Sequence, residues 1–410
     1  MDFSEPGPLS LSINENSLRI APKDARHEER DASISSASTF GPADYLITRH
    51  DQIGPEILAA PSRPAAEYPL FDWLRFSLAS IVALGHEGIV PHSDVTGNLS
   101  VQVFFALSGW LIGSILIRSS IKQLPRFFFN RATRIWVPYF FAIGALYTVS
   151  ALREPITGRW LEFLFYDLSF THNWFSLRPD AAAALAEMPL KGTGNGFWSI
   201  SVEEQFYLVA PLIILGSRFG RVPQLWMVVS LAVLYFGLTD FASISIGVSA
   251  ASVQARFGDL HLRRRSIIFL SIAATSSLIL LVQPGYYPVG APPFALCIVL
   301  LCARPGLRTQ PGILAGAISY PMYLNHWIAA FVLNGVAKHV GWLAQPALGF
   351  CSYGLAVIVA SCTYYLVDRN VMKNRGPYYS PTLGKTLGAL AYTLVLLGIL
   401  GGVTASTEFY

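Results

Sequence analysis

Several residues that can do acid–base chemistry lie in apolar segments of this sequence, where polar side chains are energetically costly. One such segment, FDWLRFSLASIVALGHEGIV, contains Arg75 and His86. They are eleven residues apart, which is about three turns or ~16 Å of helix, so both side chains point to the same side. An imidazole titrates near neutral pH and can act as a general base toward a hydroxyl. Each residue alone could be a snorkelling arginine or an interfacial histidine, but their shared face favours a polar pathway with His86 as its base.

Two adjacent carboxylates mark a second segment, FWSISVEEQFYLVAP. Glu203 and Glu204 lie within one or two turns of its start, and Tyr207 follows Glu203 by four residues, so Glu203 and Tyr207 can share a partner. A carboxylate can orient and stabilise a catalytic imidazole. We therefore predict Glu203 and Glu204 as catalytic residues beside His86. The alternative is that the pair only caps a helix at the membrane interface.

Small residues mark the segment VQVFFALSGWLIGSIL, at the spacing of closely packed helices. Gly109 and Gly113 are expected to lie against a neighbouring helix. Ser108 could hydrogen-bond a substrate or His86, and we predict it as a substrate-binding residue.

A basic stretch, RFFFNRATRIWVPYF, places Arg131 and Arg134 three residues apart and so on one helical face. Guanidinium groups bind phosphates with two parallel hydrogen bonds. The pair is thus predicted to clamp an anion. The alternative is a charge cluster that only sets membrane orientation.

One further histidine lies near the middle of an apolar segment, in AISYPMYLNHWIAAF. Pro321 is expected to loosen the helix there, with Tyr320, Tyr323 and His326 around the break. His326 is predicted to bind substrate or donor, although a structural histidine hydrogen-bonded between helices remains an alternative.

The elements that carry these residues must be membrane helices. Only 13% of the 410 residues are charged and 53% are hydrophobic, whereas about 25% are charged in a typical soluble domain. Apolar runs, several of them shorter than the roughly 20 residues of a perpendicular span, predict an all-α polytopic membrane bundle of about ten or eleven transmembrane helices. The predicted spans are 69–90, 99–117, 134–152, 198–216, 224–238, 241–255, 266–282, 288–303, 312–336, 344–366 and 386–404. The segment 153–197 is too polar to span and is predicted to hold an interfacial helix around Trp160–Trp174.

Lysine and arginine occur in every second connection between these spans. The connections 118–134, 217–224 and 256–265 are basic, whereas 91–98 and 283–287 contain neither residue. Cytoplasmic connections carry such an excess. The N-terminus is therefore predicted to be cytoplasmic, and with eleven spans the C-terminus lies outside.

The chain divides into three regions. Residues 1–66 carry ten acidic and six basic side chains and no long apolar run, which predicts a mostly disordered cytoplasmic tail without a signal peptide. Residues 67–375 form the predicted transmembrane domain, and 376–410 a linker with an additional transmembrane helix. The four cysteines lie in or beside apolar runs and the histidines are scattered, so no metal site is predicted.

The expected positions of these polar residues along the spans suggest a substrate. Arg75, Arg131 and Arg134 mark the cytoplasmic end, and His86 with the glutamates is expected near the outer third. This suits acyl-coenzyme A, with its phosphates on the arginines and its pantetheine arm reaching toward His86. His86 would then deprotonate an acceptor hydroxyl.

The sequence also resembles the membrane-bound acyltransferase-3 family, whose members O-acylate sugars and other hydroxylated molecules. The matching stretches are LRFSLASIVALGH, VFFALSGWLIG, FFFNRATRIWVPYF, FWSISVEEQFYLVAP and ISYPMYLNH. They occur in the family's order, and the resemblance covers about residues 68–375. Asp368 departs from the pattern, because many members have glutamate there.

The resemblance implies a ten-helix core, a catalytic histidine at His86 and donor-binding or structural arginines at Arg75, Arg131 and Arg134. Glu203 and Tyr207 occupy the family's Glu-x3-Tyr positions. It also implies acyl-coenzyme A, most commonly acetyl-coenzyme A, as co-substrate, with no permanently bound cofactor.

We therefore expect a bacterial inner-membrane O-acetyltransferase that modifies a glycan hydroxyl, on an exopolysaccharide, a lipopolysaccharide or a lipo-oligosaccharide. Its expected partners are membrane lipid, acyl-coenzyme A and the acceptor, and no nucleic acid. Acylation of a small metabolite such as a macrolide and transport of a glycan remain alternatives. A transporter commonly has internal repeats, and none is visible here.

Overall fold

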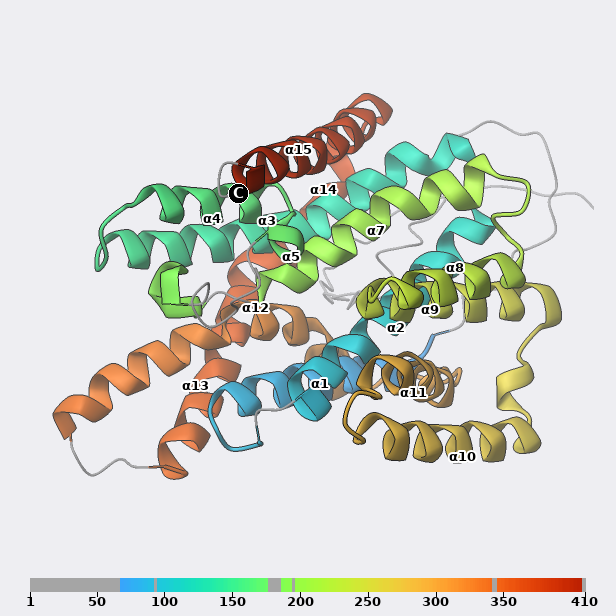
Figure 1. The fold of residues 1–410 in the computed structure, drawn as a ribbon, viewed down its shortest axis with the longest axis horizontal. Helices are drawn as coiled ribbons and strands as arrows, with labels where there is room; N and C mark the ends of the chain where they lie inside the picture. The colour runs from blue at the N-terminus through green and yellow to red at the C-terminus, as the bar shows by residue number, and fades with distance from the viewer. Residues whose placement is uncertain (1–66, 92–93, 176–185, 194–195, 341–344, 408–410) are drawn as a thin grey trace, which may run out of the picture. The chain divides into compact units, whose positions relative to one another are not determined.

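The computed structural model describes residues 67–91, 94–175, 186–193, 196–340 and 345–407 (Figure 1). These residues form helices joined by turns and loops, and no strand occurs among them. The predicted tail, residues 1–66, lies outside the described residues.

Each of the eleven predicted spans coincides with a helix in the described part of the chain. These helices are α1 (Pro69–His86), α2 (Leu99–Arg118), α3 (Leu124–Ala151), α7 (Phe197–Gly216), α8 (Pro223–Tyr235), α9 (Thr239–Phe257), α10 (Arg264–Leu281), α11 (Tyr287–Cys302), α12 (Gln310–Val340), α13 (Ala347–Thr363) and α15 (Pro381–Thr407). Proline in the first turn starts α1, α3, α8 and α11, where its missing N–H has no helical partner to lose.

Shorter helices connect these eleven. They are α4 (Gly158–Leu168), α5 (His172–Phe175), α14 (Arg369–Tyr378), the π-helical turns η2 (Asp94–Asn98) and η6 (Tyr364–Asp368), and the 3₁₀ turns η3 (Ile121–Gln123), η4 (Pro189–Gly192) and η5 (Leu260–Leu262). Helices α4 and α5 lie where an interfacial helix is predicted.

Five helical segments are long and apolar enough to cross a membrane by length and composition. They are Val95–Arg118, Phe197–Gly216, Arg264–Leu281, Ala347–Tyr378 and Pro381–Ala405. Helices α8 and α11 are shorter and apolar. The predicted all-α fold is confirmed, and the chain is a polytopic integral membrane protein.

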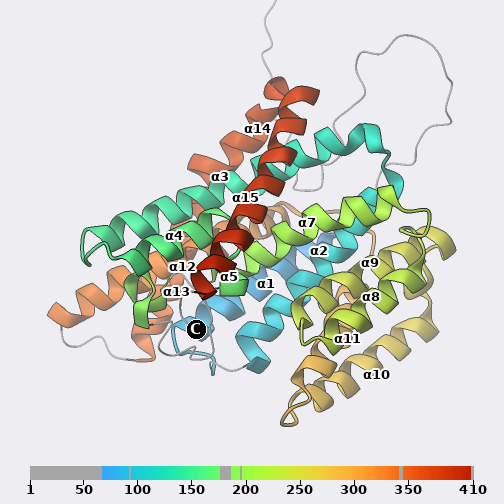
Figure 2. The ribbon, with the colours of Figure 1, turned by 45° about the horizontal axis from the view of Figure 1, so that its top comes forward.

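Helices α2 and α9 pack closely because glycine removes side-chain bulk from both. A Cβ atom on Gly109 would collide with the carbonyl oxygen of Ile244, and one on Gly247 with the carbonyl oxygen of Ala106. Gly113 faces Val248 in the same interface. This confirms the packing role predicted for Gly109 and Gly113. Helix α2 also contacts α1 and α7 (Figure 2).

Helix α12 packs against both α1 and α13. Pro321 lies inside it, yet the helix continues from Gln310 to Val340. The expected break is therefore absent. A proline in a helix interior removes one hydrogen bond of the ladder and crowds the carbonyl four residues before it, but the helix remains continuous on both sides of Pro321.

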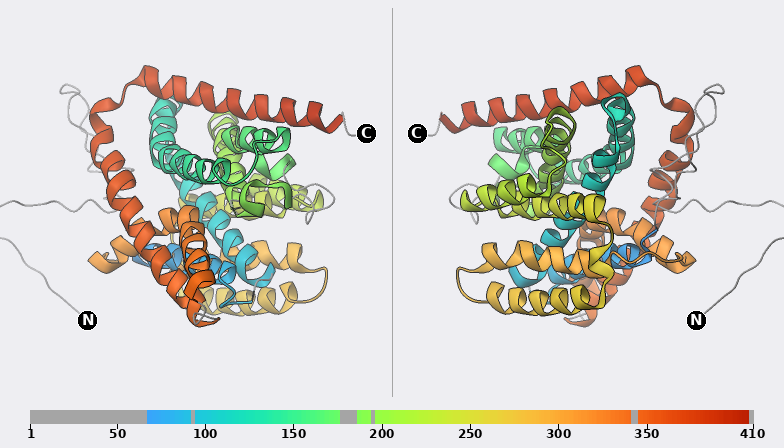
Figure 3. Two further views of the ribbon diagram at one scale, coloured as in Figure 1. Left: turned by 90° about the vertical axis from the view of Figure 1, so that its left-hand side faces the viewer. Right: turned by 90° about the vertical axis from the view of Figure 1, so that its right-hand side faces the viewer.

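The segment after α3 is fixed by a buried polar network. The Asp167 carboxylate accepts a hydrogen bond from the Tyr147 hydroxyl and lies against His172 Nδ1, both at 2.6 Å. Thr157 caps α4 by accepting from the Trp160 N–H. Helix α15 runs over α3, α4 and α7 (Figure 3).

We predict that Gly109→Val destabilises the bundle, because the added side chain must push α2 away from the α9 backbone. Overpacking of this kind costs about 1–3 kcal/mol. The thermal unfolding midpoint of the purified protein should fall. Gly144→Ala is the control, since nothing lies within 4 Å of a Cβ at Gly144 on α3. Equal midpoints for the two variants would contradict the close approach of α2 and α9.

Candidate active site

The structure brings together two histidines that are far apart in the sequence. His86 is the last residue of α1, and His326 lies midway along α12. Their ring centroids are 5.1 Å apart, with the rings tilted by 47°. His86 is exposed, whereas His326 is buried. We call these two residues the histidine pair.

Hydrogen bonds to its own helix show that Nδ1 of His326 carries a hydrogen. Its Nδ1 lies 2.9 Å from the Tyr323 carbonyl oxygen and 3.2 Å from that of Met322. A carbonyl oxygen only accepts, so Nδ1 carries a hydrogen. In the neutral ring Nε2 is then the basic nitrogen.

Glu203 and Tyr207 share a partner, as their spacing predicts. The Ser108 hydroxyl on α2 donates to Glu203 Oε1, and the Tyr207 hydroxyl lies 3.5 Å from the same Ser108 oxygen. Ser108 lies near the middle of α2, so the bond joins Glu203 on α7 to that part of α2. Sequence reasoning grouped the glutamates with His86 near the outer third and offered His86 or a substrate as the partner of Ser108. Among the described residues, Ser108 contacts Glu203 and Tyr207, because α2 presents this small residue to the second turn of α7.

Glu204 points to a different neighbour. Its Oε2 accepts a hydrogen bond of 2.9 Å from the Trp136 indole on α3. Its Oε1 is buried and finds no hydrogen-bond partner among the described residues. Trp136 was missed by sequence reasoning, because an aromatic residue in an apolar segment gives no signal of a polar contact.

The predicted arginines lie beside these carboxylates. The Arg131 guanidinium lies 4.7 Å from the centroid of the Tyr207 ring, within cation–π distance. Arg131 and Arg134 interact electrostatically with Glu203, and Arg134 also with Arg75. We call Arg75, Arg131, Arg134, Ser108, Glu203, Glu204 and Tyr207 the arginine–glutamate cluster.

An aspartate that sequence reasoning missed holds one side of this cluster. Asp72 is 2% exposed and receives two hydrogen bonds from Arg308, at 2.7 and 2.9 Å. Its Oδ1 also lies 3.8 Å from Arg75 Nη1. The one available signal was the three-residue spacing of Asp72 and Arg75, since Arg308 is 236 residues away.

Tyr323 lies between the histidine pair and the cluster. Its carbonyl accepts from His326, while its hydroxyl bonds Ser199 at 2.6 Å and the Gly196 carbonyl at 3.0 Å. The tyrosine interacts electrostatically with Glu203. Tyr323 therefore joins α12, which carries His326, to the start of α7, which carries Glu203.

The fold and these buried charges define a polytopic membrane protein with a polar interior that combines a histidine pair, carboxylates and arginines. A family model described as an acyltransferase domain matches residues 68–366. The chain belongs to this acyltransferase-3 family, which confirms the resemblance seen in the sequence.

Curated relatives include three named proteins. The O-acetyltransferase OatA of Staphylococcus aureus (strain NCTC 8325 / PS 47) is 25% identical over 354 residues, which cover 74% of this chain and 57% of OatA. The peptidoglycan O-acetyltransferase OatA of Listeria monocytogenes is 22% identical over 330 residues, 68% of this chain and 52% of that protein. Nodulation protein 10 of Rhizobium leguminosarum bv. viciae is 26% identical over 318 residues, 67% of this chain and 82% of that protein. The chain thus spans little more than half the length of either OatA. No solved structure matches it.

We predict that Asp72→Asn destabilises the protein, because it leaves the buried Arg308 side chain and the half-buried Arg75 side chain without their carboxylate. Removing one partner of a buried ion pair costs about 3–5 kcal/mol. The thermal unfolding midpoint should fall steeply, and the double variant Asp72→Asn/Arg308→Met should recover part of the loss. A double variant as unstable as the sum of its single variants would contradict a direct pairing.

Proposed function

We propose that this protein is a membrane O-acetyltransferase that moves an acetyl group from acetyl-coenzyme A to a hydroxyl of a glycan. The observation that carries the proposal is the histidine pair, in which an exposed imidazole lies against a buried one of fixed tautomer. The names of the OatA relatives support O-acetyl transfer, and one of them names peptidoglycan.

His86 is the general base of the proposed reaction. Its exposed ring can reach an acceptor hydroxyl and remove the proton as the oxygen attacks the thioester carbonyl. The new C–O bond forms, the C–S bond breaks, and the coenzyme A sulfur leaves. His86 then returns the proton to the departing thiolate, so that acetyl ester and thiol are the two products.

His326 is the positioning residue for this base. Its Nδ1–H is held by the carbonyls of Met322 and Tyr323, so its ring has a fixed orientation beside His86. A fixed neighbour restricts the rotamers of His86 and so keeps its ring in the geometry that proton transfer requires.

The arginine–glutamate cluster is the proposed donor site. Arg131 and Arg134 present guanidinium groups that suit phosphates, and Arg75 adds a third positive charge. Glu203 balances part of this charge when no donor is bound, and Ser108 and Tyr207 hold Glu203 in place. Glu203 and Glu204 are also proposed as catalytic carboxylates, and one buried oxygen of Glu204 is left without a hydrogen-bond partner among the described residues.

We place the protein in the bacterial inner membrane with its N-terminus in the cytoplasm. The basic connections support this orientation. Arg118 ends α2, Lys122 follows it and Arg126 lies in the first turn of α3, while Arg263, Arg264 and Arg265 lie at the start of α10. The donor arginines would then open toward cytosolic acetyl-coenzyme A.

We predict that His86→Ala lowers acetyl transfer by about 100-fold or more, the usual effect of losing a general base. Surface glycans from cells that express each variant would be analysed by mass spectrometry for an added acetyl group. His339→Ala is the matched control, because His339 is an exposed histidine on α12 whose Nδ1 bonds the Gly335 carbonyl of its own helix. An acetylated glycan in cells with correctly inserted His86→Ala protein would refute His86 as the base. Glycans that carry no acetyl group even with the wild-type protein would redirect the search to small hydroxylated metabolites.

We predict that Arg75→Ala raises the apparent KM for acetyl-coenzyme A by about tenfold, the usual loss of a charge-assisted hydrogen bond. The effect on kcat should be smaller, because Arg75 is proposed to bind the donor and not to react. Initial rates of purified protein at varied donor concentration measure both constants. Arg221→Ala, which removes an exposed arginine that bonds the Ser119 carbonyl, should leave them unchanged. An unchanged KM for Arg75→Ala would count against the donor site.

A further inference from the structure

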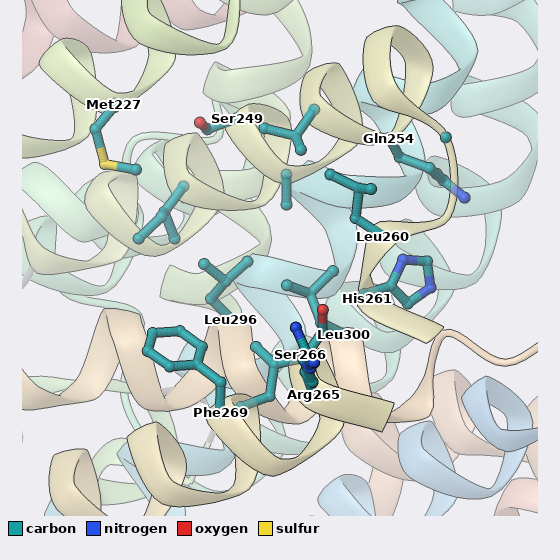
Figure 4. Close-up of a pocket in the computed structure, with 15 residues that line it drawn as sticks. Met227, Ser249, Gln254, Leu260, His261, Arg265, Ser266, Phe269, Leu296 and Leu300 are labelled. Atoms are coloured by element: carbon teal, nitrogen blue, oxygen red, sulfur yellow. The ribbon is translucent and has the colours of Figure 1, made fainter. Parts of the chain in front are cut away.

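A groove lies apart from the candidate active site, between the α8–α9 and α10–α11 helix pairs (Figure 4). Its volume is about 410 Å³, within the ~300–1,000 Å³ typical of ligand sites. None of its lining residues belongs to α1, α2, α7 or α12, which carry the histidine pair and most of the arginine–glutamate cluster. The groove is therefore separate from the candidate active site.

One end of the groove is apolar and opens at the surface of the bundle. Met227 on α8, Phe269 on α10 and Leu296 on α11 form this part (Figure 4). Met227 is 41% exposed and Phe269 69% exposed. On a membrane protein such a surface contacts lipid, so an acyl chain can enter from the side without passing through water.

The other end of the groove is polar and cationic. Gln254, Arg265 and Ser266 line it, and Arg265 is exposed at the start of α10. Arg263 and Arg264 directly precede it and are also exposed. Three consecutive arginines at the first turn of a helix attract an anion through both side-chain charge and the helix dipole.

We infer that this groove binds an anionic phospholipid, with one acyl chain along Met227, Phe269 and Leu296 and its phosphate at Arg265. The apolar wall selects a lipid over a soluble anion, and the arginines select a net negative headgroup over a zwitterionic one. Basic pockets between transmembrane helices are a recurrent form of such recognition.

A lipid bound in this groove would stabilise α9, which packs against the candidate active-site helix α2. Helix α9 lines the groove with Ser249 and Gln254, and its Ile244 and Gly247 form the close contact with α2. Ser108 precedes Gly109 in that interface and holds Glu203. A bound lipid should therefore raise the thermal unfolding midpoint of the whole protein.

Native mass spectrometry of the full-length protein, purified in detergent, tests the inference. Dioleoylphosphatidylglycerol and dioleoylphosphatidylcholine would be added in turn at equal concentration. We expect the wild-type protein to retain the anionic lipid more tightly, and Arg265→Gln to weaken that retention by about fivefold, the usual effect of one arginine near a headgroup. Arg218→Gln is the matched control, because Arg218 is an exposed arginine on another basic connection and does not line the groove.

A second variant tests the apolar end. Leu296→Trp fills the groove and should lower retention of both lipids, whereas Arg265→Gln should affect only the anionic one. Equal retention of the two lipids by the wild-type protein would overturn the inference, as would equal losses in Arg265→Gln and Arg218→Gln. Displacement of the anionic lipid by equimolar palmitoyl-coenzyme A would also overturn it and assign the groove to the donor. None of these readouts requires acetyl transfer, so failure here is distinct from failure of the proposed function.

Discussion

A charge buried in an apolar bundle is stable only when another buried group compensates it, and Asp72 does this for two arginines. Its carboxylate receives both hydrogen bonds from Arg308 and lies beside Arg75. This joins the start of α1 to the residues just before α12. The same two helices carry His86 and His326, so the ion pair at one end and the histidine contact at the other fix their alignment. The candidate active site depends on that alignment.

Glycine contacts position the next part of the site. Because α2 approaches α9 at Gly109 and Gly247, its neighbouring Ser108 is held against α7, where it donates to Glu203. Polar residues inside membranes need such partners, since each unsatisfied group is costly there. The cluster is thus a consequence of close helix packing as much as of its own charges.

Hydropathy was enough to predict the helices, because each span must present apolar side chains to lipid over most of its length. The spacing of Glu203 and Tyr207 likewise predicted a shared partner. The contact between His86 and His326 could not be predicted from the sequence, since 240 residues separate them and no local pattern indicates which helices are in contact. The contact of Ser108 with Glu203 was not predicted for the same reason, because the two residues lie on different helices. The break expected at Pro321 is absent, because α12 is packed against α1 and α13 and stays continuous through the proline.

Helix α15 lies beyond the residues that match the family and is held by glycines. Gly384 faces the Pro125 carbonyl at the start of α3, whereas Gly401 and Gly402 face Phe165 of α4 and Phe175 of α5. One end of α15 is thus fixed beside the α2–α3 connection and the other beside the α3–α7 connection. A reporter protein fused after α15 would therefore sit on the same side of the membrane as α4 and α5. Its accessibility to added protease would show on which side of the membrane α15 ends, and so establish the orientation of all the remaining helices.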